Sequence, residues 1–160
     1  CRSGLPPDVV TYSTMISAYE KCKEWARALS TLGEMRGRGI PPNVITFNSA
    51  VSACEKCGQW EAALRLLTHM AVVSIPPDLV TYNAAVSACE KSLCWERALG
   101  LLTTMGRHTL APDIVTFNAV ITACAAAGHW RHALGLLLAG MPRWSVAPNV
   151  VTLAAVIGAA

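Results

Sequence analysis

The sequence predicts an all-α protein, an α-solenoid built from stacked helical hairpins. One observation is a repeated phrase: residues 45–56 read ITFNSAVSACEK, and residues 80–91, 35 positions later, read VTYNAAVSACEK. A second is that apolar residues within each copy recur at i, i+3, i+4 and i+7, the spacing of one helix face, and no strand-like alternation is present. Repeats of about 20–50 residues are typical of solenoids, because each unit buries its apolar faces only against its neighbours.

The same residue types return at a fixed step along the chain. A threonine recurs at steps of 35 residues and finally of 36: Thr11, Thr46, Thr81, Thr116 and Thr152. A tryptophan keeps the 35-residue step: Trp25, Trp60, Trp95 and Trp130. A methionine keeps it until the last copy, which arrives one residue late: Met35, Met70, Met105 and Met141. The delay places a one-residue insertion between Leu134 and Met141.

This frame divides the chain into four complete units: 9–43, 44–78, 79–113 and 114–149. We expect residues 1–8 to be the tail of a preceding unit and residues 150–160 to be the first helix of a following one. Neither end shows the polar capping helix that closes such arrays. The chain is therefore expected to be an internal segment of a longer array.

Each unit is expected to contain two helices, eight in the complete units. In the second unit, the apolar face of the first helix comprises Phe47, Ala50, Val51 and Cys54. After a break at residues 56–58, the same spacing returns in Trp60, Ala63, Leu64 and Leu67. The proline pairs 41–42 and 76–77 end second helices, because proline lacks an N–H and clashes inside a helix. The Asp, Asn or Thr that follows can cap the next helix. We expect the four tryptophans to be substantially buried anchors of the second helices.

Composition excludes two classes of protein. Hydrophobic residues make up 53% of the chain and charged residues 14%, which argues against disorder. The longest apolar runs fall short of the roughly 18 residues that a membrane-spanning helix needs, so no membrane association is expected. A formal net charge of +3 gives only a mild preference for anionic partners.

The cysteines and histidines predict neither a metal site nor catalysis. The chain has seven cysteines, an odd number, and Cys54, Cys89 and Cys124 share one repeat position, so we expect reduced, packed thiols. Cys54 and Cys57 resemble half of a zinc site or a redox pair, but the second half is missing. The histidines flank no glutamate in a metalloprotease-like or deaminase-like pattern: His69, His108, His129 and His132. No cofactor is expected, and the chain is predicted not to be an enzyme.

The phrases PDVVTYSTMIS, PNVITFNSAVS, PDLVTYNAAVS and PDIVTFNAVIT, each followed by a helix with Ala-Leu and a Met near its end, resemble the 35-residue P-type motif of the pentatricopeptide repeat family. The resemblance covers essentially the whole chain and implies a right-handed solenoid. The chain differs from the family's usual pattern in its tryptophans, which stand where a smaller aliphatic residue is common, and in the 36-residue fourth unit. The tetratricopeptide repeat, the nearest rival, has a 34-residue unit and places its aromatic and glycine residues differently.

The resemblance implies binding of single-stranded RNA, about one base per unit, by three sets of residues. The fifth residue of each unit would face the Watson–Crick edge of a base: Ser13, Asn48, Asn83 and Asn118. The last residue would support that contact: Asn43, Asp78, Asp113 and Asn149. The second residue would clamp the base from the side: Val10, Ile45, Val80 and Val115. By the family's pairings, the array should read 5′-A-U-U-(C/U)-3′.

The chemistry of these positions suits that role. An Asn amide offers a donor and an acceptor to a pyrimidine edge, and a β-branched side chain offers a stiff apolar wall. The alternative is that Asn48, Asn83 and Asn118 only satisfy backbone groups near the helix starts. The pairing with an Asp or Asn at the unit's end favours RNA readout.

Three lysines lie eight residues after the base-facing position, about two helical turns on: Lys21, Lys56 and Lys91. They resemble the family's phosphate-contacting lysines, and a periodic row of cations would follow a nucleic-acid backbone. The alternative is a favourable charge at a helix C-terminus. The fourth unit has Ala126 instead, so its hold on RNA is expected to be weaker.

The resemblance also implies a mitochondrial or plastid location, a role in RNA processing, stability, editing or translation, and other RNA-processing proteins as partners. Two alternatives stay open. The small net charge and apolar composition also fit a protein-binding helical scaffold. A nuclease or deaminase function would require a catalytic domain outside this sequence.

Overall fold

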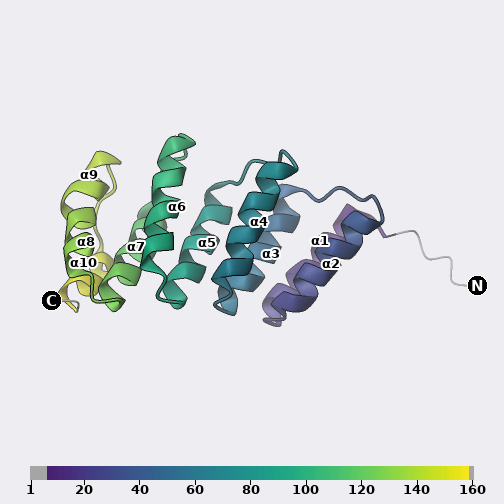
Figure 1. The fold of residues 1–160 in the computed structure, drawn as a ribbon, viewed down its shortest axis with the longest axis horizontal. Coiled ribbons are helices and arrows are strands. Elements are labelled where there is room, and N and C mark those ends of the chain that lie inside the picture. The colour runs from purple at the N-terminus through teal and green to yellow at the C-terminus, as the bar shows by residue number, and fades with distance from the viewer. Residues whose placement is uncertain (1–6, 159–160) are drawn as a thin grey trace, which may run out of the picture.

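The structure is a computed structural model that describes residues 7–158, and within that range every regular element is a helix (Figure 1). The first helices of the units are α1 (Val9–Lys21), α3 (Val44–Lys56), α5 (Leu79–Lys91), α7 (Ile114–Ala126) and α10 (Val150–Ile157). The second helices are α2 (Trp25–Gly37), α4 (Trp60–Val72), α6 (Trp95–Arg107) and α8 (Trp130–Gly135), the last continued by η1 (Leu136–Gly140) and α9 (Met141–Arg143). The expected tail of a preceding unit at residues 1–8 lies mostly outside the described residues.

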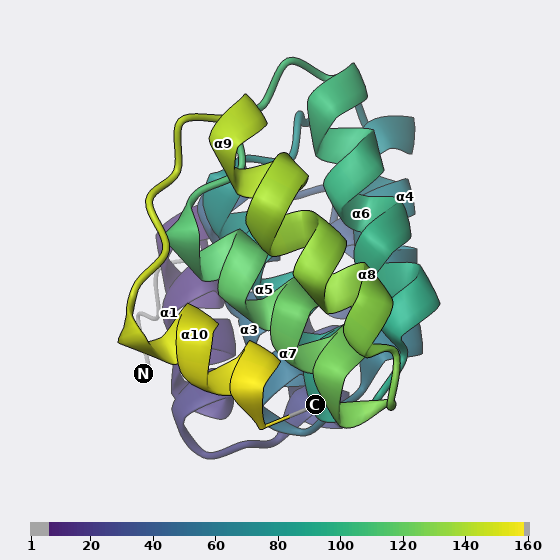
Figure 2. The same ribbon diagram turned by 90° about the vertical axis from the view of Figure 1, so that its left-hand side faces the viewer.

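The hairpins stack side by side into an elongated α-solenoid, which confirms the predicted fold class (Figure 1). Each first helix packs against the first helix of the next unit, in the order α1, α3, α5, α7, α10. The second helices form the other layer, as the view along the array shows (Figure 2). No helix within residues 7–158 is long and apolar enough to span a bilayer.

Every first helix begins at the predicted cap. The capping side chain accepts a hydrogen bond from the threonine N–H three residues later in all five cases: Asp8, Asn43, Asp78, Asp113 and Asn149. At Asp78, Oδ1 lies 2.9 Å from the Thr81 nitrogen, and the Asp78 N–H donates back to Thr81 Oγ1. These reciprocal bonds satisfy backbone donors that the first turn of a helix leaves without partners. The recurring threonine therefore marks the start of each unit.

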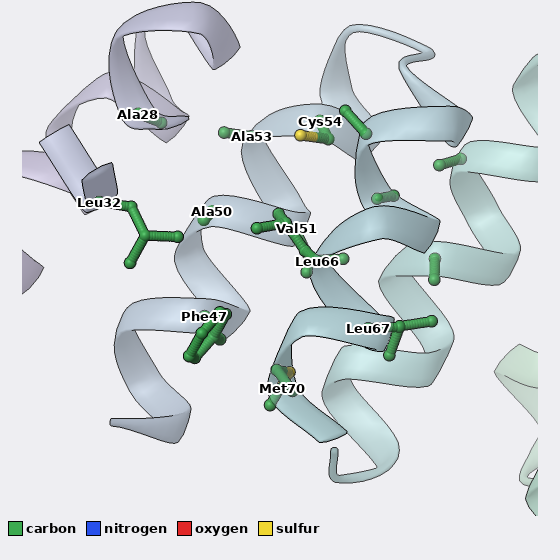
Figure 3. Close-up of a cluster of buried hydrophobic side chains, with 14 of the residues drawn as sticks. Ala28, Leu32, Phe47, Ala50, Val51, Ala53, Cys54, Leu66, Leu67 and Met70 are labelled. Carbon is green, nitrogen blue, oxygen red and sulfur yellow. The ribbon is translucent and has the colours of Figure 1, made fainter. Parts of the chain in front are cut away.

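The core lies between the two layers (Figure 3). Phe47 and Met70 are fully buried there, facing each other across one hairpin. Cys54, Cys89 and Cys124 are also fully buried, which confirms their packing role. Burial raises the pKa of these thiols to about 11, 12 and 11, respectively. They are therefore protonated and poorly nucleophilic at neutral pH.

The tryptophans are less buried than the sequence predicted. Trp25, Trp60 and Trp95 are half-buried, and Trp130 is 44% exposed, so the prediction is wrong for Trp130. The reason is that cover for these rings comes from the next unit: the Arg97 guanidinium lies over the Trp60 ring, 5.9 Å from its centroid. Trp95 lies 4.0 Å from the His129 ring, measured between centroids. Within residues 7–158, no further second helix is present to cover Trp130.

The inserted residue of the fourth unit is absorbed inside its second helix. Between α8 and α9 the chain makes a π-helical turn, Leu136–Gly140, which is wider than an α-helical turn by one residue. Met141 consequently returns to the fully buried position that the other units give to their methionines: Met35, Met70 and Met105. The insertion therefore leaves the next first helix, α10, in its place beside α7.

The turn inside each hairpin gives a stability prediction. The residue at the turn has positive φ in all four units. In two units it is a glycine, with φ of 65° at Gly58 and 78° at Gly128, and in the other two it carries a side chain, with φ of 58° at Lys23 and 56° at Leu93. This conformation costs a side-chain-bearing residue energy that glycine does not pay. Leu93 is 56% exposed, so little packing is lost on its removal. Leu93→Gly is therefore expected to raise the free energy of unfolding by about 0.5–1 kcal/mol in urea denaturation.

The matched control is the opposite change at the equivalent glycine. Gly58→Leu should lower the free energy of unfolding by about 1 kcal/mol or more, because the new side chain must adopt φ near 65°. Opposite signs for the two variants isolate the backbone effect. A loss of stability in Leu93→Gly would show that the packing of Leu93 outweighs it.

Candidate nucleic-acid interface

The predicted base-facing residues lie on the first helices, and the three asparagines among them bond the last residue of their own unit: Asn48, Asn83 and Asn118. Asn48 Nδ2 is 3.1 Å and 3.2 Å from the two carboxylate oxygens of Asp78. Asn83 Nδ2 is 3.2 Å and 3.3 Å from those of Asp113. The last residue of a unit is also the N-cap of the next first helix, so each of these contacts links one first helix to the start of the next. The structure thus brings together three of the four pairs that the resemblance implied, those of Asn48, Asn83 and Asn118.

A buried threonine completes each pair, and sequence reasoning missed this role. The hydroxyl of Thr81 donates to Asn48 Oδ1, and Thr116 and Thr152 donate in the same way to Asn83 and Asn118. All three threonines are fully buried. The threonine repeat was visible in the sequence, but spacing alone did not show that its hydroxyl reaches the preceding unit.

These contacts determine how the amide is oriented. A carboxylate only accepts hydrogen bonds, so the NH₂ group of Asn48 must face Asp78 and its oxygen must face Thr81. If one N–H is shared between the two carboxylate oxygens, the amide keeps its second N–H and one oxygen lone pair for another partner. Burial raises the pKa of Asp78, but hydrogen bonds from Thr81 and Asn48 outweigh it and leave that pKa below the ordinary value. Asp78 is therefore ionised at neutral pH.

The alternative role of the asparagines is not what the described residues show. The hydrogen bonds of Asn48, Asn83 and Asn118 run to the side chain of the last residue of their own unit and to the threonine of the next, not to backbone groups near their own helix starts. They therefore couple neighbouring units. The coupling is weakest in the fourth unit, where Asn118 Nδ2 makes one bond of 3.3 Å to Asn149 Oδ1.

The first unit has a shorter fifth residue and a groove beside it. Ser13 Oγ lies 2.8 Å from Thr46 Oγ1, and no bond from Ser13 reaches Asn43 within the described part of the chain. A groove of about 460 Å³ remains, lined among others by Val10, Ser13, Lys21, Asn43 and Ile45. The clamp, the fifth residue, the last residue and the lysine of one unit thus share a single groove.

The clamping positions form an exposed apolar row. Val10, Ile45, Val80 and Val115 are 69%, 62%, 60% and 54% exposed. The row continues at Val151 on α10, which is 57% exposed and which the sequence analysis did not name. The exposed aliphatic side chains thus recur at one position of every unit along the layer of first helices.

The lysines end their helices, as the sequence suggested, but two of them are ion-paired. Lys56 Nζ lies 2.8 Å from Glu20 Oε1 of the preceding unit, and Lys91 pairs in the same way with Glu55. Sequence reasoning did not identify these glutamate partners. The Glu-Lys dipeptide at the end of the first helix in the first three units was the available signal, because the two charges alternate along the array.

The lysine that would pair with Glu90 is replaced by Ala126 in the fourth unit, and Glu90 gives a prediction about how stability depends on pH. Burial raises the pKa of Glu90 above its ordinary value of 4.5, an effect that Lys91 opposes and Glu55 reinforces. A raised carboxyl pKa means that the folded state binds the proton more tightly, so stability falls as pH rises past 4.5. Glu90→Gln is expected to be more stable than the parent at pH 7 by about 0.5 kcal/mol, a small value because solvent screens this half-exposed group. The gain should vanish at pH 4 in urea denaturation, and a gain of equal size at both pH values would contradict this explanation.

The remaining candidates do not assemble into a site. Within residues 7–158 there is no group of three or more His, Cys, Asp or Glu side chains that could hold a metal ion. Cys57 donates from Sγ to the Lys23 carbonyl, 3.1 Å away. His129 and His132 pack on the Trp95 ring.

Known structures show the same architecture. The chain is 27% identical to the pentatricopeptide repeat protein PPR10 crystallised with an 18-nt psaJ RNA element, with a TM-score of 0.82 over 99% of this chain and 24% of that one. PPR10 from maize, in a second crystal structure, is 30% identical with a TM-score of 0.78, over 99% and 22% of the two chains. The chain thus spans about a quarter of the length of PPR10.

A more distant structure shares the fold. The PPR domain of the Arabidopsis thaliana protein-only RNase P 1, solved with tRNA, is 16% identical with a TM-score of 0.83 over 96% of this chain and 80% of that one. No curated protein matches the sequence. The family model described as the PPR repeat family matches residues 7–56, 42–91, 77–126 and 112–160. Since these matches span nearly the whole chain in the register of its helical hairpins, the chain belongs to the PPR repeat family.

Proposed function

We propose that this chain binds single-stranded RNA and reads about one base per unit, in the order 5′-A-U-U-(C/U)-3′. The observation that carries the proposal is the repeated arrangement of an oriented Asn amide beside exposed aliphatic side chains. With one N–H shared between the two Asp113 oxygens, Asn83 keeps a second N–H and an oxygen lone pair for a base, and Val80 and Val115 are exposed on either side along the array.

The amide matches uracil. The uracil edge presents one N–H donor between two carbonyl acceptors, so a side chain with one donor and one acceptor can bond it twice. A flat base inserted between successive clamping residues would cover apolar surface that is otherwise exposed. The same geometry at Asn48 and Asp78 supports U as the second base.

The first and fourth units differ in ways that fit other bases. The open groove at Ser13 leaves space for a purine, and Asn43 uses Oδ1 for the helix cap, which leaves its NH₂ group free to donate. A donor of this kind suits adenine, whose edge offers the N1 acceptor. In the fourth unit, Asn149 replaces the carboxylate and holds Asn118 by one bond, which supports C or U with less discrimination.

The test is a comparison of RNA oligonucleotides that differ at one base. Four oligonucleotides with A, C, G or U at the third position of the predicted site are compared by filter binding at one salt concentration. We expect U to bind about tenfold more tightly than the purines, the discrimination that two hydrogen bonds provide. Equal binding of all four would contradict sequence reading. Absence of binding to any single-stranded RNA would favour the alternative, a protein-binding helical scaffold.

The wider role follows from the family and is part of the proposal. We propose that the chain acts by occupying an RNA sequence, without catalysis of its own, in organellar RNA processing, stability, editing or translation. Other RNA-processing proteins would then be its partners. Import of the full-length protein fused to a fluorescent reporter into mitochondria or plastids tests the location, and a cytosolic distribution would contradict it.

A further inference from the structure

A row of glutamates runs beside the lysines, displaced by one unit. Glu20, Glu55 and Glu90 each precede a lysine in sequence, yet Glu20 and Glu55 meet the lysine of the next unit instead. The contacts formed are Glu20 with Lys56, at 2.8 Å, and Glu55 with Lys91. These pairs bridge α1 to α3 and α3 to α5. They lie on the layer of first helices, which also carries the base-facing residues.

The glutamate side chains are less exposed to solvent than the lysine side chains. The side chains of Glu20 and Glu55 are 19% and 17% exposed, against 35% and 45% for Lys56 and Lys91. Ser52 Oγ also donates to Glu20 Oε1 at 2.9 Å. Each carboxylate therefore stays close to the lysine amino group, and it offsets that positive charge for any phosphate approaching the same surface.

The two ends of this row carry charges of opposite sign that form no ion pair within the described residues. Lys21 has no acidic group within ion-pairing distance among residues 7–158. Glu90 has no cationic partner in that range, because Ala126 stands where the next lysine would be. Three lysines and three glutamates leave the row with no net charge. A simple count of lysines therefore overstates its attraction for a polyanion.

We propose that Glu20, Glu55 and Glu90 limit the affinity of this surface for the RNA backbone, so that binding depends on bases more than on phosphates. The inference rests on the proposed function, and it assigns a role in specificity to residues outside the base-reading set. Two unit charges about 8 Å apart in water interact by an energy that corresponds to roughly a twofold change in affinity. Removing all three carboxylates should therefore raise affinity about eightfold at low salt.

The experiment compares glutamine variants on two polyanions, a 12-nt oligouridine and inorganic polyphosphate. The variants are Glu20→Gln, Glu55→Gln, Glu90→Gln and the triple variant, in the 160-residue chain at 50 mM salt and upward. The matched control is Glu96→Gln, which changes net charge equally but lies exposed on α6, in the layer of second helices. Circular dichroism establishes that each variant is folded.

We expect the triple variant to bind both polyanions about eightfold more tightly than the parent, and Glu96→Gln to change binding less than twofold. The affinity of the triple variant should also depend more steeply on salt concentration, by roughly 0.7 of a log unit for each lysine made available to phosphates. The inference is overturned if the triple variant binds no more tightly than Glu96→Gln, or if it binds more weakly because the glutamates hold the lysines in place. A parent that shows no base preference would instead contradict the proposed function, and polyphosphate would still test the charge row.

Discussion

Thr81→Val is expected to destabilise the chain by about 1–3 kcal/mol and to weaken discrimination at the second base. The valine side chain has nearly the same shape as threonine, so packing around this fully buried position is kept. The hydroxyl is lost, and with it the acceptor of the Asp78 N–H at 3.2 Å and the donor to Asn48 Oδ1. Leaving such groups without partners costs about 1–3 kcal/mol.

The effect on RNA follows from the same bonds. Without the Thr81 hydroxyl, only Asp78 holds the Asn48 amide, and the amide can rotate away from the base. Discrimination between U and the other bases should fall at the second position and stay unchanged at the third. Filter binding with single-base variants of the RNA measures this difference, and urea denaturation measures the stability.

A matched control is available on α4, the second helix of the preceding unit. Thr68 is exposed, and its hydroxyl donates only to the Leu64 carbonyl one turn earlier, at 3.2 Å. Thr68→Val should change stability by less than about 0.5 kcal/mol and leave base preference unchanged. Equal effects of the two substitutions would show that the Thr81 hydroxyl has no special role at the unit boundary.

The features that the sequence predicted are those that depend on local spacing. The hairpins, the caps such as Asp78 and the buried slot of Cys54 follow from apolar periodicity, proline positions and a polar residue before each helix. The inserted residue was also located correctly, although its accommodation by a π-helical turn was not predicted, because periodicity does not show how a helix absorbs an extra residue.

Contacts across unit boundaries were harder to predict. The pairs Thr81 with Asn48 and Lys56 with Glu20 join residues 33 and 36 positions apart. A repeat of 35 residues brings all positions of neighbouring units close together, so the period alone does not select which side chains meet. The exposure of Trp130 was missed for the same reason, since its cover depends on the following unit.

Asn83→Ser is expected to change the preferred third base from U to G. In the parent, Asn83 donates to both carboxylate oxygens of Asp113 and accepts from Thr116. The shorter serine should bond the Thr116 hydroxyl, as Ser13 bonds Thr46 in the first unit at 2.8 Å. Asp113 would then lose its amide partner and present a free carboxylate oxygen to an enlarged groove.

That environment suits guanine. The guanine edge carries two adjacent N–H donors, and a carboxylate only accepts, so the pair forms charge-assisted hydrogen bonds. Uracil loses both of its bonds to the amide. The expected change is about tenfold in the relative affinity of G over U at this base, with no change at the other three. The loss of stability should be about 1 kcal/mol or less, because the site is half-exposed.

A second substitution separates the role of the carboxylate from the effect of groove size. Asn83→Ser combined with Asp113→Asn reproduces the Ser13 and Asn43 pair of the first unit, where the NH₂ group of Asn43 is free because Oδ1 caps α3. The double variant should prefer A over G, since its amide donor suits the N1 acceptor of adenine. The carboxylate kept in the single variant Asn83→Ser would instead repel that acceptor. If both variants are folded and both keep the preference for U, Asn83 and Asp113 do not read the base. If both prefer purines equally, groove size alone selects the base and the hydrogen-bonding account is wrong.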